Sequence, residues 1–319
     1  MTPPLRIGIS SCLLGQKVRF DGGHKRDAFL VDTFGRYVEW VPVCPEVEVG
    51  MGTPREAVRL EKAASGPFPI LMVAPKSGTD WTPRMTAFAR RRVEELAALD
   101  LSGYVLKSNS PSCGLERVRL YGEGTMPTRT GRGLFAEALA SRFPTLPLEE
   151  EGRLSDPRLR ENFVERVFAY RRLRELFSGR WTVGDLVRFH TAHKLTVLAH
   201  QPAAYTDLGR LVAGAKGRAR GALQQEYEQR FMGALSKIAT PKRQANVLQH
   251  IVGYFRDRLD ADDRAELLSL IEDHRSGVVP LVVPITLIRH HVRRLGIEYL
   301  KGQVYLEPHP WELALRNHV

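Results

Sequence analysis

Three cysteines are the residues of this chain best suited to chemistry, and each stands in the same kind of place. Cys12, Cys44 and Cys113 each come after a short apolar run, at residues 5–9, 37–43 and 104–106. Such runs, alternating with helical patterns, predict a parallel sheet wrapped by helices, and these sheets bind ligands beyond the carboxyl ends of their strands. We therefore expect the three thiols to meet at one edge of a sheet.

Two interpretations of these thiols remain open from their spacing. Free cysteines are often small buried hydrophobic residues with no chemical role. Thiolates also bind soft metals and iron–sulfur clusters, although the separations in this chain match no zinc-ribbon motif. A disulfide framework is disfavoured, because the number of cysteines is odd and the chain has no secretory features. The cysteines are therefore either inert or ligands.

Polar residues in the same turns could complete a site. Glu46 stands close to Cys44 in sequence and is a candidate to contact whatever the thiol binds, with an exposed loop carboxylate as the alternative. The turn-rich loop after the first cysteine brings Arg19 and Asp21 toward the same place. Glycines within residues 131–133 precede a helical pattern, which indicates either helix amides that face an anion or a tight turn.

Composition and length predict two domains in the cytoplasm. The chain has 319 residues, 43% of them hydrophobic, which suits two domains at roughly 150 residues each. Residues 144–156 are rich in Pro, Glu and Gly, so we place the domains at 1–152 and 153–319. No run approaches the ~20 apolar residues of a membrane span, and the N-terminus lacks the apolar core of a signal peptide. We expect no membrane contact.

The second half of the chain loses the strand patterns and is predicted to be all-α. Its helical patterns cover residues 158–177, 183–198, 205–212, 223–238, 243–258, 264–272 and 284–295. His190, His193 and His200 lie on one helix face. Packing and hydrogen bonding are favoured over metal binding for them, since no cysteine or acidic residue joins them at ligand spacing.

Charge is unevenly distributed along the chain. The formal net charge is +11, and residues 151–319 hold 27 Lys and Arg against 19 Asp and Glu, whereas residues 1–150 hold 20 against 17. A basic excess on one domain is typical of polyanion binding, although solvated basic surfaces without a partner are also common. The glycine-rich segment 214–221 suits phosphate contact. Its cations are Lys216, Arg218 and Arg220, and candidates for base stacking are Tyr205, Tyr227 and Tyr254.

Three motifs, taken in order, resemble the thiouracil desulfidase (TudS) family over roughly residues 5–148. They are Cys-Leu-Leu-Gly (12–15) with Arg-Phe-Asp-Gly (19–22), Cys-Pro-Glu (44–46) with Pro-Arg (54–55), and Ser-Pro-Ser-Cys-Gly (110–114). Segments of the second half resemble the helical domain fused to TudS domains in RudS-type tRNA 4-thiouridine desulfidases. They include Phe-His-Thr-Ala-His-Lys-Leu (189–195), Asn-Val-Leu-Gln-His-Ile-Val-Gly-Tyr (246–254) and Pro-His-Pro (308–310).

The resemblance implies a Rossmann-like α/β domain with a 4Fe-4S cluster, followed by an all-α domain. It assigns the cluster to Cys12, Cys44 and Cys113 and leaves the fourth iron without a protein ligand. That iron would act as a Lewis acid on thiocarbonyl sulfur, while water attacks the carbon and sulfur leaves as hydrosulfide without net electron transfer.

The resemblance also implies roles for polar residues near the cluster. Glu46 would be the general acid/base, and Ser110 would position substrate or relay protons. Asn109 and Ser112 would bond pyrimidine edges or cluster sulfurs, and Lys107, like Arg19 and Asp21, would support the loops.

The predicted function is the conversion of 4-thiouridine in tRNA to uridine, and the helical domain is predicted to bind the RNA. One alternative is desulfuration of free 2-thiouracil or 4-thiouracil, in which case the helical domain is an oligomerisation or partner module. The other is a non-catalytic iron–sulfur RNA-binding regulator, which would have no need of Glu46.

Overall fold

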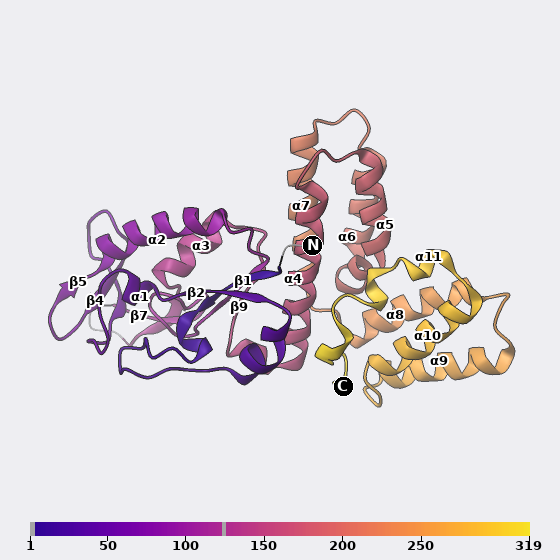
Figure 1. Ribbon diagram of the computed structural model, residues 1–319, viewed down its shortest axis with the longest axis horizontal. Coiled ribbons are helices and arrows are strands. Elements are labelled where there is room, and N and C mark those ends of the chain that lie inside the picture. The colour runs from indigo at the N-terminus through magenta and orange to yellow at the C-terminus, as the bar shows by residue number, and fades with distance from the viewer. Residues whose placement is uncertain (1–3, 123–125) are drawn as a thin grey trace. The chain divides into compact units, whose positions relative to one another are not determined.

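The computed structural model describes residues 4–122 and 126–319 and forms two compact units, Met1–Ser155 and Asp156–Val319 (Figure 1). The division falls slightly after the predicted boundary at residue 152. A short 3-10 helix, Arg153–Ser155, belongs to the first unit, and Arg153 Nε donates to Glu149 Oε1 on β9 at 2.7 Å. Each unit is described separately below.

A four-stranded, all-parallel sheet forms the core of the first unit, in the order β2-β1-β6-β9. Its strands are β1 (Arg6–Ser10), β2 (Glu39–Val43), β6 (Gly103–Leu106) and β9 (Leu148–Glu150). Strands β2 and β6 flank β1 on opposite sides, so the strand order reverses beside β1. Open parallel sheets form their ligand crevice at such a switch point.

A second sheet of five strands was not predicted. Its order is β5-β4-β3-β7-β8, and only β3 with β7 is a parallel pair. The strands are β3 (Arg59–Lys62), β4 (Ile70–Ala74), β5 (Thr79–Asp80), β7 (Val118–Tyr121) and β8 (Thr128–Gly131). Short connections join β3 to β4 and β4 to β5, and short connections between neighbouring strands give antiparallel pairs. The expectation of a parallel sheet therefore holds for the first sheet alone.

Helices α2 (Thr82–Ala97) and α3 (Leu134–Arg142) pack together on one face of the parallel sheet (Figure 1). The ring of Phe135 lies 6.3 Å from that of Phe88 on α2 and 6.0 Å from that of Tyr104 on β6, centroid to centroid. Tyr104 in turn requires glycine on the neighbouring strand, because a Cβ at Gly8 would lie 2.1 Å from its ring. A one-turn helix, α1 (Pro45–Glu48), follows β2.

The second unit is helical throughout its described residues, as the sequence predicted. Its helices are α4 (Pro157–Phe177), α5 (Val183–His200), α6 (Pro202–Ala213), α7 (Arg220–Leu235), α8 (Pro241–Val252), α9 (Ala261–Arg275), α10 (Val282–Leu295) and α11 (Glu298–Lys301). Side-chain caps fix several starts: Asp156 begins α4, and Thr182 forms a capping box with Asp185 at α5. Among the described helices, none combines the length and apolar character needed to cross a membrane.

Candidate active site

The three cysteines line one cavity of about 370 Å³ in the first unit. Cys44 comes directly after β2, Cys12 lies just beyond β1, and Cys113 lies in the loop that follows β6. Because β2, β1 and β6 are adjacent and parallel, their three loops meet at one edge of the sheet. The predicted convergence of the thiols is therefore confirmed as a shared cavity.

All three are free thiols in sheltered positions. Burial raises the pKa of Cys12 to about 11, with Lys107 opposing the shift, and burial also raises the pKa of Cys44 and of Cys113. Such thiols become thiolates when a cationic ligand binds them. Within residues 4–122 and 126–319, no three His, Cys, Asp or Glu side chains are close enough to hold a single metal ion.

Glu46 is positioned by the single turn of α1, whose first residue, Pro45, lacks only an N–H that a helix start leaves unpaired anyway. Its carboxylate is held by Arg55, since Oε2 accepts from Nη2 at 2.5 Å and from Nε at 3.0 Å. The two side chains are only 13% and 6% exposed. Glu46 is therefore not the exposed loop carboxylate of the alternative interpretation.

Two serine hydroxyls occupy the other oxygen of this carboxylate. Ser112 Oγ donates to Glu46 Oε1 at 2.7 Å, and Ser110 Oγ approaches the same atom at 3.4 Å. The hydroxyls are 2.9 Å apart, and Ser112 Oγ lies 3.6 Å from Cys113 Sγ. A continuous hydrogen-bonded path thus connects the carboxylate with a thiol. Ser112, the weaker candidate from the sequence, makes the shorter bond.

Backbone contacts hold the loop that carries these serines. Ser110 Oγ accepts from the N–H of Cys113 at 3.2 Å. The Ser112 carbonyl accepts from Phe135 and Ala136, the second and third residues of α3, at 3.0 and 3.1 Å. A Cβ at Gly133 would lie 2.4 Å from that carbonyl oxygen, so only glycine permits this approach. The first amides of α3 therefore bond the loop. Residues 131–133 do not form the tight turn of the alternative interpretation either, since Gly131 ends β8 and Gly133 is the extended N-cap residue of α3.

The remaining candidates of the first unit have structural contacts or line the cavity. Lys107 forms an ion pair with Glu151, whose carboxylate also accepts from Ser108 N–H at 2.7 Å, so Lys107 supports its loop. Arg19 pairs with Asp21 at 3.5 Å. Asn109 lines the cavity, is exposed and has a φ of 56°, a left-handed conformation that asparagine tolerates well.

Arg55 is the residue whose role sequence reasoning missed. Besides holding Glu46, its Nη1 donates to the carbonyls of Val18 at 3.0 Å and Gly52 at 2.9 Å. It thus joins the loop after β1 to the loop after α1. A basic residue in a glycine-rich turn gives no sign of these partners, and only its place in the Pro-Arg motif (54–55) could have drawn attention to it.

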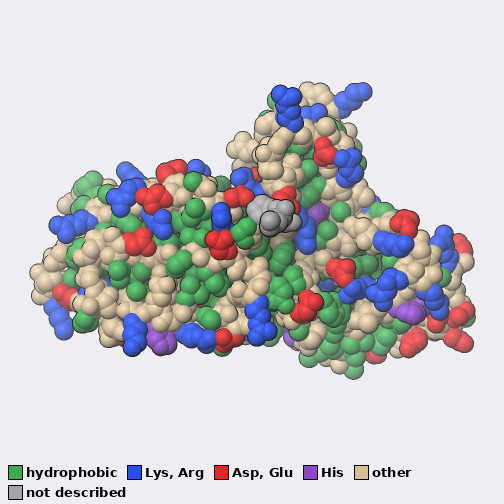
Figure 2. Space-filling model, in the orientation of Figure 1, with side chains coloured by type: hydrophobic (Ala, Val, Ile, Leu, Met, Phe, Trp, Pro, Cys, Tyr) green, Lys and Arg blue, Asp and Glu red, His purple; other side chains and the backbone are tan. Residues whose placement is uncertain are grey.

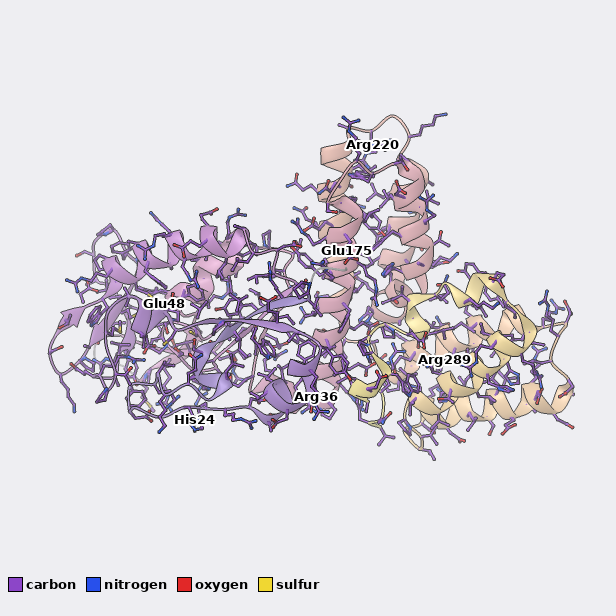
Figure 3. All side chains as sticks on the ribbon, in the orientation of Figure 1. His24, Arg36, Glu48, Glu175, Arg220 and Arg289 are labelled. Atoms are coloured by element: carbon purple, nitrogen blue, oxygen red, sulfur yellow. The ribbon has the colours of Figure 1, made fainter. Side chains whose placement is uncertain are left out.

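In the second unit, the predicted phosphate-binding cations surround the tip of the α6–α7 pair, where Lys and Arg side chains gather (Figures 2 and 3). Lys216 and Arg218 lie in the connecting loop and are exposed. Arg218 Nη2 is 2.5 Å from Glu226 Oε2, so part of its charge is offset. Arg220 begins α7 and lies over the Trp181 ring at 5.1 Å, so this cation has the apolar contact that the sequence did not indicate.

The three histidines predicted to share one helix face, His190, His193 and His200, make hydrogen bonds within the fold. His190 Nδ1 is 3.1 Å from Tyr227 Oη, and His193 Nδ1 is 2.8 Å from the Phe189 carbonyl. His200 Nδ1 is 2.5 Å from the Lys237 carbonyl.

The tyrosines proposed for base stacking differ in exposure. Tyr227 is fully buried and cannot stack on a base. Tyr254 is 38% exposed and already stacks on Tyr299, with centroids 4.9 Å apart.

Comparison with known proteins gives two family matches. Residues 7–151 match the family described as 2-thiouracil desulfurase, and residues 194–310 match a family described as a protein of unknown function, DUF1722. The uncharacterized protein YbgA of Escherichia coli strain K12 is 34% identical over 161 residues, which cover 50% of this chain and 95% of that protein. The uncharacterized protein YbbK of Bacillus subtilis strain 168 is 33% identical over 116 residues, which cover 34% and 72%.

Among solved structures, a 4Fe-4S-dependent thiouracil desulfidase, TudS, is 30% identical to this chain. The match covers 47% of this chain and 93% of that one, with a TM-score of 0.39. The matched family, together with the shared cavity, makes this protein an enzyme that cleaves a C–S bond. The chain belongs to the 2-thiouracil desulfurase family and carries a DUF1722 region in its helical unit.

Proposed function

We propose that this protein converts 4-thiouridine in tRNA to uridine with the help of a 4Fe-4S cluster. The observation that carries the proposal is one cavity lined by Cys12, Cys44, Cys113 and the Glu46 carboxylate. The family match supports C–S cleavage. The basic excess of residues 151–319 supports a polyanionic substrate.

The cysteines fit the proposed cluster by their chemistry and placement. All three are free, they come from three different loops, and thiolates are the usual ligands of iron–sulfur clusters. When bound, the cluster supplies a thiophilic iron that polarises the thiocarbonyl bond. The Ser112 hydroxyl, 3.6 Å from Cys113 Sγ, would donate a hydrogen bond to that ligand when it rotates away from Glu46 Oε1.

The chain's own residues would manage the protons. In the overall reaction water and a thiocarbonyl give a carbonyl and hydrogen sulfide, so no electrons are gained or lost. Glu46 Oε1 would accept a proton as water attacks the thiocarbonyl carbon, because Oε2 is engaged by Arg55. Ser110 and Ser112 would return a proton toward the departing sulfur along their shared hydrogen bond.

The decisive experiment is incubation of a thiolated tRNA pool with anaerobically purified protein, followed by nucleoside analysis. We expect 4-thiouridine to fall, uridine to rise by the same amount and sulfide to appear, with 2-thiolated nucleosides unchanged. Loss of the 2-thio isomers, or no change in any tRNA nucleoside, would contradict the proposed substrate.

Desulfuration of a free base is the second candidate, and the description of the matched family as 2-thiouracil desulfurase favours it. The helical unit would then serve oligomerisation or a partner. Comparing kcat/KM for 2-thiouracil, 4-thiouracil and thiolated tRNA separates the two functions, because a free-base enzyme would turn over tRNA poorly.

A further inference from the structure

We propose that the outer face of the five-stranded sheet binds single-stranded RNA, namely the unpaired nucleotides beside the one that reacts. Tyr121 on β7 would stack on a base, and Arg119 on the same strand would contact a phosphate. Strands β4, β5 and β7 of this sheet are labelled in Figure 1. The inference rests on the proposed function for the presence of RNA, and it assigns part of the RNA contact to the first unit.

The two faces of this sheet differ in burial. Leu60 on β3 and Leu120 on β7 are buried on the inner face. Successive side chains of a strand point to opposite faces, so Arg59, Arg119 and Tyr121 lie on the outer face. There Tyr121 is half-buried, Arg119 is exposed and the side chain of Arg59 is 42% exposed. Although β3 and β7 are interior strands, their outer face is therefore open to solvent.

Tyr121 and Arg59 form a positioned stacking surface. The guanidinium carbon of Arg59 lies 4.6 Å from the centroid of the Tyr121 ring. Glu61, the register partner of Tyr121 on the neighbouring strand, accepts from Arg59 Nε at 2.6 Å. Unpaired RNA bases stack on aromatic rings and on guanidinium planes, and groups that are already positioned lose little freedom on binding.

The arginines beside this surface favour a polyanionic partner. Arg119 on β7, Arg129 on β8 and Arg117, just before β7, are exposed and have no acidic partner among the described residues. The carboxylate of Glu61 is already paired with Arg59. An aromatic ring among unpaired cations is typical of single-stranded nucleic acid binding, because stacking and phosphate contact then act together.

The outer face begins next to the cavity that contains the cysteines. Val58 lines the cavity, and Arg59, the next residue, begins β3. Strand β7 follows the loop that carries Cys113, and it runs parallel to β3. Tyr121 is level with Glu61, so at about 3.3 Å per residue it stands roughly 10 Å along the strand from Val58. The ring is therefore placed for a nucleotide that flanks the reacting one.

Photo-crosslinking tests the contact without turnover. The probe is a tRNA with uridine at the position of 4-thiouridine and 5-bromouridine at its neighbours, irradiated in complex with the full-length, anaerobically purified protein. We expect mass spectrometry to find the adduct on the β7 peptide, at Tyr121. Adducts confined to peptides of the helical unit would overturn the inference.

Turnover measures the size of the contact. Tyr121→Ala should lower kcat/KM for thiolated tRNA by roughly 5- to 100-fold, the range for loss of one stacked base, and Tyr121→Phe should retain it. Both variants should keep wild-type kcat/KM for a free thiolated base, which has no flanking nucleotide, and this result also shows that they fold. Arg119→Gln should reduce the slope of log tRNA affinity against log salt by about 0.7, the value per phosphate of a single strand.

Lys62→Gln is the matched control for the lost charge. Lys62 is an exposed cation of β3, two residues after Leu60 and so on the inner side of the strand. Its replacement should leave the salt slope unchanged, and equal effects of Arg119→Gln and Lys62→Gln would overturn the inference. A wild-type dimer that Tyr121→Ala dissociates in sedimentation, with tRNA affinity unchanged, would also overturn it, because the face would then bind a second copy.

Failure of the inference differs from failure of the proposed function. A Tyr121 adduct without sulfide release from any thiolated RNA would disprove the function and leave the RNA-binding face standing. Sulfide release from tRNA at wild-type kcat/KM by Tyr121→Ala would support the function and disprove the role of this face.

Discussion

At the scale of single residues, the two carboxylate oxygens of Glu46 have different hydrogen-bond partners. Oε2 is fixed by Arg55, and Oε1 faces Ser110 and Ser112. In the proposed mechanism, Oε1 exchanges protons with these two hydroxyls while Arg55 keeps the carboxylate in place.

Replacing Glu46 with glutamine should abolish most activity while preserving the cluster. Glutamine keeps the size of the side chain but cannot accept a proton, so turnover should fall by roughly 10²-fold or more, the usual contribution of a general acid/base. Iron content, measured on the same preparation, should match that of the wild type. Wild-type turnover by Glu46→Gln would eliminate the proton-transfer role.

Each cysteine should be necessary for iron. Protein purified without oxygen should be brown and hold about four irons per chain, as expected for a 4Fe-4S cluster. Cys12→Ala, Cys44→Ala and Cys113→Ala should each lose iron and activity, measured by iron assay and visible absorption. If all three variants kept full iron, the thiols would be the inert buried residues of the alternative interpretation.

The site residues themselves could be recognised in the sequence, but the side chains with which they form hydrogen bonds and ion pairs could not. A cysteine after an apolar run is recognisable because a strand end is a local feature. The pairing of Glu46 with Arg55 is not local, since it depends on how two glycine-rich turns fold against each other. Ser112 was underrated for the same reason: its partner Oε1 lies on a different loop.

At the scale of elements, periodicity predicted the long helices and strands β1, β2 and β6 of the first sheet, but neither β9 nor the second sheet. Strands β3 and β5 are short and largely polar, so no apolar run marks them. Threonine is a common N-cap residue, but Thr82 does not cap α2. Its hydroxyl instead accepts from Met72 N–H at 2.7 Å and so joins α2 to β4.

Helix α5 should lose stability as the pH falls below neutrality. Burial lowers the pKa of His190 and His193 to about 4, whereas unfolded histidine titrates near 6.5. Between about pH 6.5 and 4 the unfolded chain therefore binds protons that the folded chain does not, and stability falls with pH. Hydrogen exchange of α5 amides, corrected for the intrinsic pH dependence, should report this loss.

Variants isolate the contribution of His193 to that pH dependence. His193→Gln should flatten the slope, and His250→Gln, at an exposed position of α8, should leave it unchanged. His200 acts in the opposite sense, because its bond to Glu165 raises its pKa although burial opposes the shift. An unchanged slope in His193→Gln would show that folding does not lower the pKa of this imidazole.

The α6–α7 loop should contribute to RNA binding through charge. If Lys216, Arg218 and Arg220 contact phosphates, reversing all three to glutamate should reduce the slope of log affinity against log salt by about 3, at roughly 0.9 per contact. Reversal of Arg84, Arg90 and Arg91 on α2 changes the net charge equally and is the control. Equal losses of tRNA affinity in both triple variants would mean that only net charge matters and that this loop makes no specific contact.

At the scale of the whole molecule, each unit is the size of a separate protein. The match to Escherichia coli YbgA covers 95% of that protein but only 50% of this chain, so a chain about as long as one unit exists alone. Charge also divides along the same line, because residues 151–319 carry most of the basic excess. The approximate length and the net charge of each unit could be predicted from the sequence, because each is a total over many residues and does not depend on which side chains meet.

Separating the units should therefore separate chemistry from RNA affinity. A chain of residues 1–155 keeps the three cysteines, Glu46 and Glu151, so it should hold iron and release sulfide from a free thiolated base. It should lose most activity on thiolated tRNA, because the helical unit that would bind phosphates is missing. Residues 156–319 alone should bind tRNA with an affinity that falls steeply between 50 and 200 mM salt, by about 10³-fold if some six phosphates are engaged.

Iron content of the 1–155 chain checks that it is folded. If that chain, with full iron, processed tRNA as efficiently as the complete protein, the helical unit would have no part in substrate binding, and an oligomerisation role would explain it better.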